Sequence, residues 1–483
     1  MELLLTLARA EGHEPLHAQL ERQLREAIRG GRLATGARLP ATRVLAAELD
    51  VSRGVVVEAY AQLTAEGYLR TRRGAGTVVA AAARPAPAPQ PSPHPRPVPE
   101  DFHPGTPDLA GFPRAAWLRS LRAVLRDAPH DALGYANPAG TPELRQALAR
   151  YLGRARGVAV DADRTLVTSG LTQGVALAFR ALRRRGARRV VVEDPGFTVH
   201  RGIAAHCGLE VVPVPVDAHG LVTDALADVD ADVALVTPAH QMPLGGVLAP
   251  ERRAALVAWA EARDAYVIED DYDAEHRYDR EPVGALQGLA PERVLYAGCA
   301  SKVLAPSLRL GWLVLPQALV AQVATEKALD DLGTSALDQR ALADFLERGE
   351  LDRHLRRMRP RYRARRDALI AALARELPSW RVTDGIAAGL HVVALLPEAV
   401  DEAAFLAAAA ERGMRLHGLS WFRASGPSAG VPPGLALGFG NASEPAIARA
   451  VAQLAKVAAT VPGATPHAAP AAAQRGSEAA AAR

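Results

Sequence analysis

A proline-rich segment, AAARPAPAPQPSPHPRPVPE at residues 81–100, constrains the fold of this chain more than any other feature. Each proline fixes φ and removes a backbone N–H donor, so a segment with proline at nearly every second position cannot join a helix or a sheet. As an extended polyproline II chain at ~3.1 Å per residue it would span roughly 60 Å. We therefore expect a linker between an N-terminal domain, residues 1–80, and a larger domain, residues 101–460.

The remaining composition is typical of a soluble globular protein. Hydrophobic residues make up 49% and charged residues 23% of the 483 residues, and no run approaches the ~18 apolar residues that a membrane helix needs. The two cysteines form no CxxC metal motif, and the opening MELLLTLARAEG lacks the apolar run of a secretion signal. We expect a cytoplasmic protein with no membrane partner, and a disordered alanine-rich tail at residues 461–483.

Residues 1–80 have the pattern of a winged helix-turn-helix. Apolar residues recur every four positions over 16–28, which predicts a helix that ends at Gly30-Gly31. Residues 39–49 predict a second helix, and Ser52 can cap a third helix that runs to Glu66. The stretches YLRTRR and TVV flank a glycine-rich turn and predict a two-stranded hairpin.

Several residues of this domain are candidates for contacts with DNA. The N-terminus of a recognition helix faces the major groove, which places Arg53 beside base edges where arginine binds guanine bidentately. Arginines before and within the second helix would hold phosphates, and those of the hairpin suit a wing. The candidates are Arg38, Arg43, Ser52, Arg53, Arg72 and Gly76. They are also compatible with ordinary solvated arginines, because residues 1–80 hold 11 Arg against 9 Asp and Glu.

The order of motifs favours the DNA-binding interpretation. Residues 16–79 resemble the winged helix of the GntR family, with its G-R-L-x-x-G-x-R-L-P block, V-S-R turn, A-Y-x-x-L-x-x-E-G-Y helix end and R-x-G-x-G-T wing. Ala41, Gly54 and Val55 depart from the usual residues and would alter which bases are read. The resemblance implies binding to double-stranded operator DNA.

Behind the linker, short runs rich in valine, alanine and leucine alternate with helical stretches. This pattern predicts an α/β domain with a mostly parallel sheet and helices on both faces. In such sheets ligands bind at the carboxyl ends of the strands, and the residues that follow the predicted strands are chemically distinctive. They are Ser169, Gly170, Leu171 and Thr172, then Phe197, then Gln241, then Asp270 and Tyr272, and finally Ser301 and Lys302 with Arg309 seven residues on.

Together these groups meet the needs of pyridoxal 5′-phosphate (PLP). Lys302, one of only three lysines in the chain, would form the Schiff base, and Asp270 would keep the pyridine nitrogen protonated. Tyr272 would reach the ring oxygen, Phe197 would stack on the ring, and the turn at 169–172 with Arg309 would hold the phosphate. Each residue alone also fits a surface, core or metal-binding role, and only their joint occurrence favours PLP.

Residues 101–456 resemble the fold-type I aminotransferases, which have a smaller C-terminal α+β subdomain. The motifs are D-F-x-P-G-x-P-D (101–108), F-P-x-x-x-W (112–117), G-Y-x-x-P-x-G (134–140), E-D-P-G-F (193–197), T-P-A-H-Q-x-P (237–243), E-D-D-Y-D (269–273), S-K-x-L-A-P-x-L-R-L-G-W (301–312) and A-G-L-H (388–391). With the N-terminal domain, they resemble the MocR-type, GabR-like branch of GntR regulators. That resemblance implies a head-to-tail homodimer in which Tyr135 reaches the neighbour's phosphate, and a small-molecule effector.

Departures from the aminotransferase pattern bear on activity. Thr172 stands where the family has glutamine, Cys299 replaces a serine or threonine that contacts the phosphate, and Ala436 aligns with the arginine that holds the substrate carboxylate. We therefore expect inefficient transamination, with PLP itself or an amine as effector. The favoured interpretation is a PLP-dependent transcriptional regulator. The alternatives are a PLP-dependent aminotransferase with a DNA-binding appendage and a regulator with a vestigial cofactor site.

Overall fold

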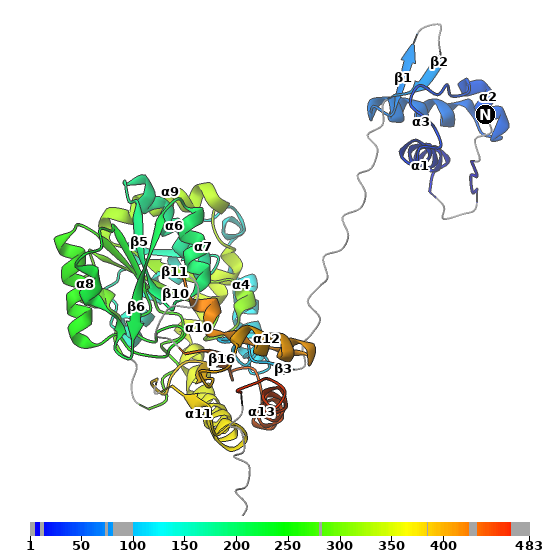
Figure 1. The fold of residues 1–483 in the computed structure, drawn as a ribbon. Coiled ribbons are helices and arrows are strands. Elements are labelled where there is room, and N and C mark those ends of the chain that lie inside the picture. The colour runs from blue at the N-terminus through cyan, green and yellow to red at the C-terminus, as the bar shows by residue number, and fades with distance from the viewer. Residues whose placement is uncertain are drawn as a thin grey trace, which may run out of the picture. The chain divides into compact units, whose positions relative to one another are not determined.

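The computed structural model describes residues 5–9, 14–72, 76–80, 100–279, 283–383, 385–424 and 432–464. The chain divides into two compact units, residues 1–96 and 97–483 (Figure 1). The predicted linker lies outside the described residues except for Glu100, which begins the short strand β3 (Glu100–Asp101). No helix among the described residues is long and apolar enough to cross a membrane.

The first unit is a three-helix domain with a hairpin, as predicted. Helices α1 (Leu16–Arg29), α2 (Thr42–Glu48) and α3 (Arg53–Ala65) precede the antiparallel strands β1 (Leu69–Arg72) and β2 (Gly76–Val79). Helix α2 is shorter than the predicted 39–49, because the Leu39 N–H donates to the carbonyl of Thr77 in β2. Leu39 therefore belongs to the contact with the hairpin, and Pro40 separates it from the helix.

An eight-stranded mixed sheet forms the centre of the second unit, in the order β4-β11-β10-β9-β8-β5-β6-β7. Its strands are β4 (Thr165–Thr168), β5 (Arg189–Asp194), β6 (Glu210–Asp217), β7 (Gly220–Leu221), β8 (Val233–Val236), β9 (Tyr266–Asp270), β10 (Val294–Cys299) and β11 (Gly311–Val314). Strands β5, β6, β8, β9 and β10 pair in parallel, whereas β7 and β11 are antiparallel to their neighbours. The mostly parallel α/β fold is confirmed.

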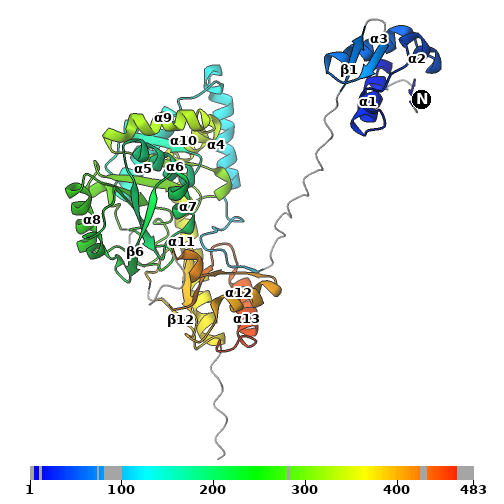
Figure 2. The same ribbon diagram turned by 45° about the horizontal axis from the view of Figure 1, so that its top comes forward.

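Helices cover both faces of this sheet because successive side chains of each strand point to opposite sides. Leu166 of β4 packs with α6 (Leu171–Arg184), α7 (Thr198–His206) and α9 (Val320–Asp331). Its neighbour Val167 packs on the other face, with α5 (Pro142–Arg156) and α10 (Ala336–Glu347). Helix α8 (Pro250–Ala262) lies over the β5–β8–β9 part of that face, and α4 (Arg114–Asp127) contacts α10 (Figures 1 and 2).

The C-terminal part is a smaller α+β subdomain. Strands β12 (Arg381–Val382), β13 (His391–Leu395), β16 (Gly434–Gly438) and β15 (His417–Gly418) form an antiparallel sheet in that order. Helices α11 (Glu350–Glu376), α12 (Glu402–Glu411) and α13 (Glu444–Ala458) lie beside it (Figure 2), and β14 (Met414–Arg415) pairs with β3. Val461 and Ala464 are buried in its core, so packing extends past the predicted end at 460.

Candidate cofactor site and DNA-binding surface

A cavity of about 210 Å³ lies at the carboxyl ends of the central strands of the second unit. The sheet order places β10, β9, β8 and β5 side by side, so residues far apart in the sequence meet at one edge. Of the residues predicted for the cofactor, those that line the cavity are Leu171, Thr172, Phe197, Asp270, Tyr272, Ser301, Lys302 and Arg309. Ser169, Gly170, Gln241 and Tyr135 are not among its lining residues.

Asp270, at the end of β9, is a buried carboxyl group without a cation bound to it. Its Oδ1 has no hydrogen-bond partner, and its Oδ2 lies 3.4 Å from Nε2 of His200. Burial raises the pKa of Asp270 well above its usual value, with further increases from Asp271, Asp273 and Glu193. Burial also lowers the pKa of His200 to about 4, so this imidazole is neutral near pH 7. The Asp270 carboxyl group is therefore poised to bind a cationic donor, since such a partner would offset its desolvation.

The side chain of Lys302 lies close to the backbone at Gly105. Gly105 has a φ of +79°, and a Cβ added there would lie 3.0 Å from the Lys302 Nζ. The Lys302 carbonyl accepts a hydrogen bond of 3.0 Å from Nε2 of the buried His276. The backbone of the lysine is thus fixed, and only glycine fits at 105 without displacing the amine.

The N-terminus of α6 and Arg309 form a positively polarised end of the site. Gly170, with φ +87°, precedes α6, and a Cβ there would lie 2.5 Å from Nη2 of Arg309. Arg309 Nη2 donates to the Ser169 carbonyl at 2.9 Å. A helix N-terminus with free amides beside a guanidinium is a favourable place for a phosphate group.

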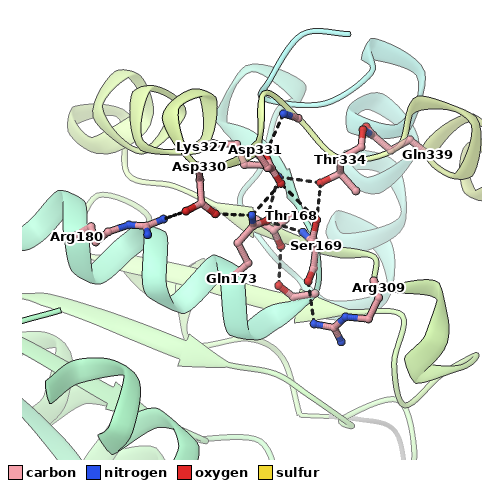
Figure 3. Close-up of polar contacts among 12 residues, drawn as sticks. Thr168, Ser169, Gln173, Arg180, Arg309, Lys327, Asp330, Asp331, Thr334 and Gln339 are labelled. Carbon is pink, nitrogen blue, oxygen red and sulfur yellow. Dashed lines mark hydrogen bonds and ion pairs between the residues drawn. The ribbon is translucent and has the colours of Figure 1, made fainter. Parts of the chain in front are cut away.

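Behind this turn lies a polar network that the sequence did not reveal (Figure 3). Gln173 Oε1 accepts the Ser169 N–H at 2.7 Å and Lys327 Nζ at 2.9 Å. The Lys327 side chain is fully buried and also donates to Asp331 Oδ2 at 2.5 Å and to Thr334 Oγ1 at 2.9 Å. The Ser169 hydroxyl lies 3.3 Å from Thr334 Oγ1, so it belongs to this network. The scarcity of lysine and the i,i+4 spacing of Lys327 and Asp331 are the signals that could have found it.

The side chain of Gln241 connects the loops that follow strands β5 and β8. Its Nε2 donates to the carbonyls of Pro195 at 2.9 Å and Met242 at 2.8 Å, and lies 3.2 Å from Glu193 Oε2. Burial raises the pKa of Glu193 to about 7. These bonds fix the loops after β5 and β8, and the direct contact predicted between Gln241 and the cofactor stays a prediction.

The C-terminal subdomain packs against two residues that line the cavity. Ala436 of β16 is buried in a cluster with Met242 and Phe422, and Phe197 and Tyr272 pack against this cluster. The Phe197 ring also contacts the rings of His200 and Trp421, with centroids 5.1 and 5.8 Å apart. Ala436, which we predict to align with a carboxylate-binding arginine, therefore lies in apolar surroundings that contact two residues of the cavity.

In the first unit the predicted DNA contacts whose side chains are described are exposed. The side chains of Arg38, Arg43, Ser52 and Arg53 are open to solvent. Ser52 stands at the N-cap of α3 with extended backbone, but its side chain makes no capping hydrogen bond, unlike our expectation. Gly76 has a φ of +81° and pairs with Arg72, whose side chain lies outside the described residues.

Sequence reasoning also missed a feature of the first unit, the segment of residues 5–9. Gln19 of α1 exchanges two hydrogen bonds with the backbone of Ala8, at 2.9 and 3.0 Å, and Gln23 does the same with Thr6, at 3.0 and 2.6 Å. Arg9 then binds Asp50, which has a left-handed φ of +51° in the turn between α2 and α3. The segment thus ties α1 to the helix-turn-helix.

The sequences of both units match known protein families. Residues 16–79 match the model for bacterial regulatory proteins of the gntR family, and residues 107–430 match that for aminotransferase class I and II. The HTH-type pyridoxine biosynthesis transcriptional regulator PdxR of Corynebacterium glutamicum is 36% identical over 450 residues, which cover 92% of this chain and 96% of that protein. The probable rhizopine catabolism regulatory protein MocR of Rhizobium meliloti is 34% identical, over 84% of this chain and 87% of that protein.

Solved structures resemble the second unit. The Pyrococcus horikoshii kynurenine aminotransferase matches with a TM-score of 0.67 and 26% identity, over 74% of this chain and 90% of that one. LysN, an α-aminoadipate aminotransferase from Thermus thermophilus solved with a phosphopyridoxyl-leucine, matches with a TM-score of 0.67 and 26% identity, over 74% and 91%. The chain therefore belongs to the MocR-type branch of GntR-family transcriptional regulators, which joins a winged helix-turn-helix to an aminotransferase-like domain.

Proposed function

We propose that the aminotransferase-like unit binds PLP at Lys302 and that the winged helix-turn-helix binds operator DNA in response. The observation that carries this proposal is the convergence of eight predicted residues from four strand ends on one cavity. A metabolic enzyme would also have such a cavity, but an intact gntR-type domain and regulator relatives over most of the chain support the regulator.

The residues around the cavity fit PLP. Asp270 Oδ1 is buried and lacks a partner, as expected of an acceptor for a protonated ring nitrogen. Phe197 and Tyr272 supply an aromatic face and a hydroxyl group, and Arg309 with the N-terminus of α6 supplies a phosphate site. When bound, PLP would supply an aldehyde that condenses with the Lys302 amine and releases water.

A homodimer is part of the proposal. Tyr135 is 95% exposed and is not among the residues that line the cofactor cavity of its own subunit, so it is free to reach a neighbour. Leu332, at the end of α9, is 61% exposed, and a Cβ on the adjacent Gly333 would lie 3.4 Å from Pro138 in the loop after Tyr135. The exposure of Tyr135 and Leu332 favours burial of this region against a second copy of the chain. Two winged helices on one dimer suit paired half-sites.

The apolar cluster around Ala436 favours sensing over transamination. Carboxylate substrates need a cationic partner in a buried site, and Ala436, where the resemblance leads us to expect that cation, carries no charge and packs among apolar side chains. We therefore propose PLP itself, or an amine held by other contacts, as the effector.

Visible absorption during a PLP titration tests the cofactor assignment. We expect a yellow band that borohydride makes permanent in the wild type and in Lys456→Ala, whose lysine is exposed in α13. Lys302→Ala should lack it. Peptide mapping of the reduced protein should find the added mass at residue 302, and a band of equal intensity in Lys302→Ala would overturn the assignment.

A further inference from the structure

A second cavity, of about 310 Å³, lies between α5 and α11 and shares no lining residue with the cofactor cavity. Its walls come from the C-terminal end of α5, the loop after β9 and the first turns of α11. Four of its lining residues are arginines and two are acids. We call it the arginine pocket, and its lining residues are Tyr151, Arg154, Ala155, Arg156, Glu275, Asp352, Leu355, Arg356 and Arg359.

Arg156 is a buried cation whose hydrogen bonds are incomplete. The residue is 1% exposed, and its Nε donates to Asp271 Oδ2 at 2.7 Å. Its two terminal nitrogens, Nη1 and Nη2, are also buried and have no hydrogen-bond partner among the described residues. Buried polar groups are nearly always hydrogen-bonded, because an unpaired donor keeps its full desolvation cost. Arg156 therefore brings unpaired donors to the wall of the pocket.

Two further arginines of the pocket have no carboxylate partner. Arg356 and Arg359 are three positions apart in α11, so their side chains lie on the same face of the helix. Neither side chain forms a hydrogen bond or an ion pair within the part of the chain that the structure describes. Arg154, by contrast, donates to Asp352 Oδ2 at 2.8 Å and so neutralises that carboxylate. The pocket is therefore left with two guanidinium groups that lack a counter-charge.

Glu275 is the remaining acid of the pocket, and its negative charge would repel an anion there. Its Oε1 accepts a hydrogen bond of 3.2 Å from the Tyr151 hydroxyl group. Desolvation and the neighbouring Asp271 raise the pKa of Glu275 to about 7, whereas Arg156 and the bond from Tyr151 oppose this increase. Asp271 in turn accepts a bond of 2.8 Å from the Tyr296 hydroxyl group. Glu275 therefore gains a proton as the pH falls from about 8 to about 6, and its protonated form does not repel an anion.

We propose that the arginine pocket binds a small molecule through a dianionic oxyanion group such as phosphate. Guanidinium groups present paired N–H donors that match the oxygens of phosphate and sulfate. The pocket also has the volume of a small-ligand site, which is roughly 300 Å³ or more. A small ligand can enter a pocket whose inner arginine is 1% exposed, whereas the backbone of a DNA duplex cannot. This inference goes beyond the proposed function, because the site is separate from the one proposed for PLP.

Equilibrium dialysis with radiolabelled sulfate tests the proposal. Sulfate keeps its double charge throughout the neutral pH range, and full-length protein loaded with PLP and reduced with borohydride has its cofactor phosphate site already filled. We expect saturable binding in the wild type. Arg356→Met and Arg359→Met should each weaken it about tenfold, the size of one hydrogen bond to a charged group. Arg363→Met, at an exposed position of α11 outside the pocket, should bind sulfate as the wild type does.

Glu275→Gln distinguishes a binding site from a merely structural cluster. It keeps an acceptor for the Tyr151 hydroxyl group and removes the negative charge. Sulfate binding should therefore become tighter, by several-fold more at about pH 8 than at about pH 6. A variant that only disturbed the fold would weaken binding instead.

Equal sulfate binding in the wild type and in the Arg356→Met/Arg359→Met double variant would overturn the inference. Failure of Glu275→Gln to tighten binding would also overturn it, because the anion would then lie elsewhere. Absence of a PLP band in the wild type would instead overturn the proposed function, and the same variants would still report on the arginine pocket.

Discussion

The candidate sites of the two units differ in how far apart their residues lie in the sequence and in what surrounds their side chains. The DNA-contact candidates all fall within residues 38–76, and the described arginine side chains among them are exposed. The cofactor candidates that line the cavity range from Leu171 to Arg309, and their groups are packed against partners from distant strands. Exposed contacts suit a polyanion that supplies the missing partners on binding. Asp270 is buried among these candidates, whereas Thr172 and Arg309 are exposed. Contacts gathered around one cavity suit a small ligand.

The difference predicts how each site responds to substitution. A change in the cofactor site should alter both ligand affinity and folding stability, because each side chain there also holds its neighbours. A change among the DNA contacts should alter affinity alone.

Gly170→Ala should show the largest effect on the cofactor side of the comparison. The new methyl group would meet the Arg309 guanidinium at 2.5 Å and also occupy a left-handed φ of +87°. We expect PLP affinity, measured by absorption, to fall more than about 100-fold, since the phosphate end of the site must open to accommodate it. Gly186→Ala is the matched control, with φ +106° and no atom within 4 Å of a Cβ. An equal loss of PLP affinity in both variants would show that backbone strain alone is responsible.

Lys327→Met tests whether the polar network around Lys327, behind the turn at residues 169–172, supports both PLP affinity and folding stability. It removes an ammonium group with three acceptors and leaves Asp331 without its cation. We expect the free energy of unfolding of the second unit to fall by about 2 kcal/mol, less than for a fully buried pair because Asp331 is partly exposed. PLP affinity should fall about tenfold, because Gln173 and Ser169 lose their support.

Lys456→Met, at an exposed position in α13, is the control for Lys327→Met and should behave as the wild type in thermal unfolding and PLP titration. Loss of stability in Lys327→Met without loss of PLP affinity would mean that the network supports the fold but not the site.

Arg53→Ala and Arg43→Ala should show the smallest structural effect. Both side chains are exposed, and the contact recorded for Arg53 is a long one, 3.4 Å from its Nε to Thr42 Oγ1. We expect unchanged thermal unfolding, with a loss of about 1–3 kcal/mol in specific DNA binding for Arg53→Ala. Arg43→Ala should weaken binding to all DNA sequences. It should also reduce the slope of log affinity against log salt concentration by about one. A drop in melting temperature comparable to that of Lys327→Met would contradict the expected difference between the two units, because these exposed arginines would then also stabilise the fold.

Local features of both units were predictable from the sequence. The first N-terminal helix follows from hydrophobic periodicity, and the mostly parallel sheet follows from apolar runs that alternate with helical stretches. The residues predicted to follow the strands include eight that line the cavity. Strand β11 was missed, because four residues, GWLV, carry no period of their own. Its antiparallel insertion between β4 and β10 brings the N-terminus of α6 close to Lys302.

Long-range polar partners were not predictable. Lys327 meets Gln173 across 154 positions, and His240 meets Asp273 across 33. Periodicity shows that a segment is a strand or a helix, but the pairing register that brings such groups together depends on tertiary packing. Arg9 and Asp50, which join across 41 positions, illustrate the same limit in the first unit.

DNA affinity measured with and without PLP tests the central claim most directly. The probe is a duplex from the region upstream of the chain's own gene, and fluorescence anisotropy follows its binding to the full-length protein over a range of salt concentrations. We predict salt-dependent binding that PLP alters at least several-fold in the wild type and leaves unchanged in Lys302→Ala. Formation of the PLP band with no change in DNA affinity would contradict the account, because the two units would then act independently.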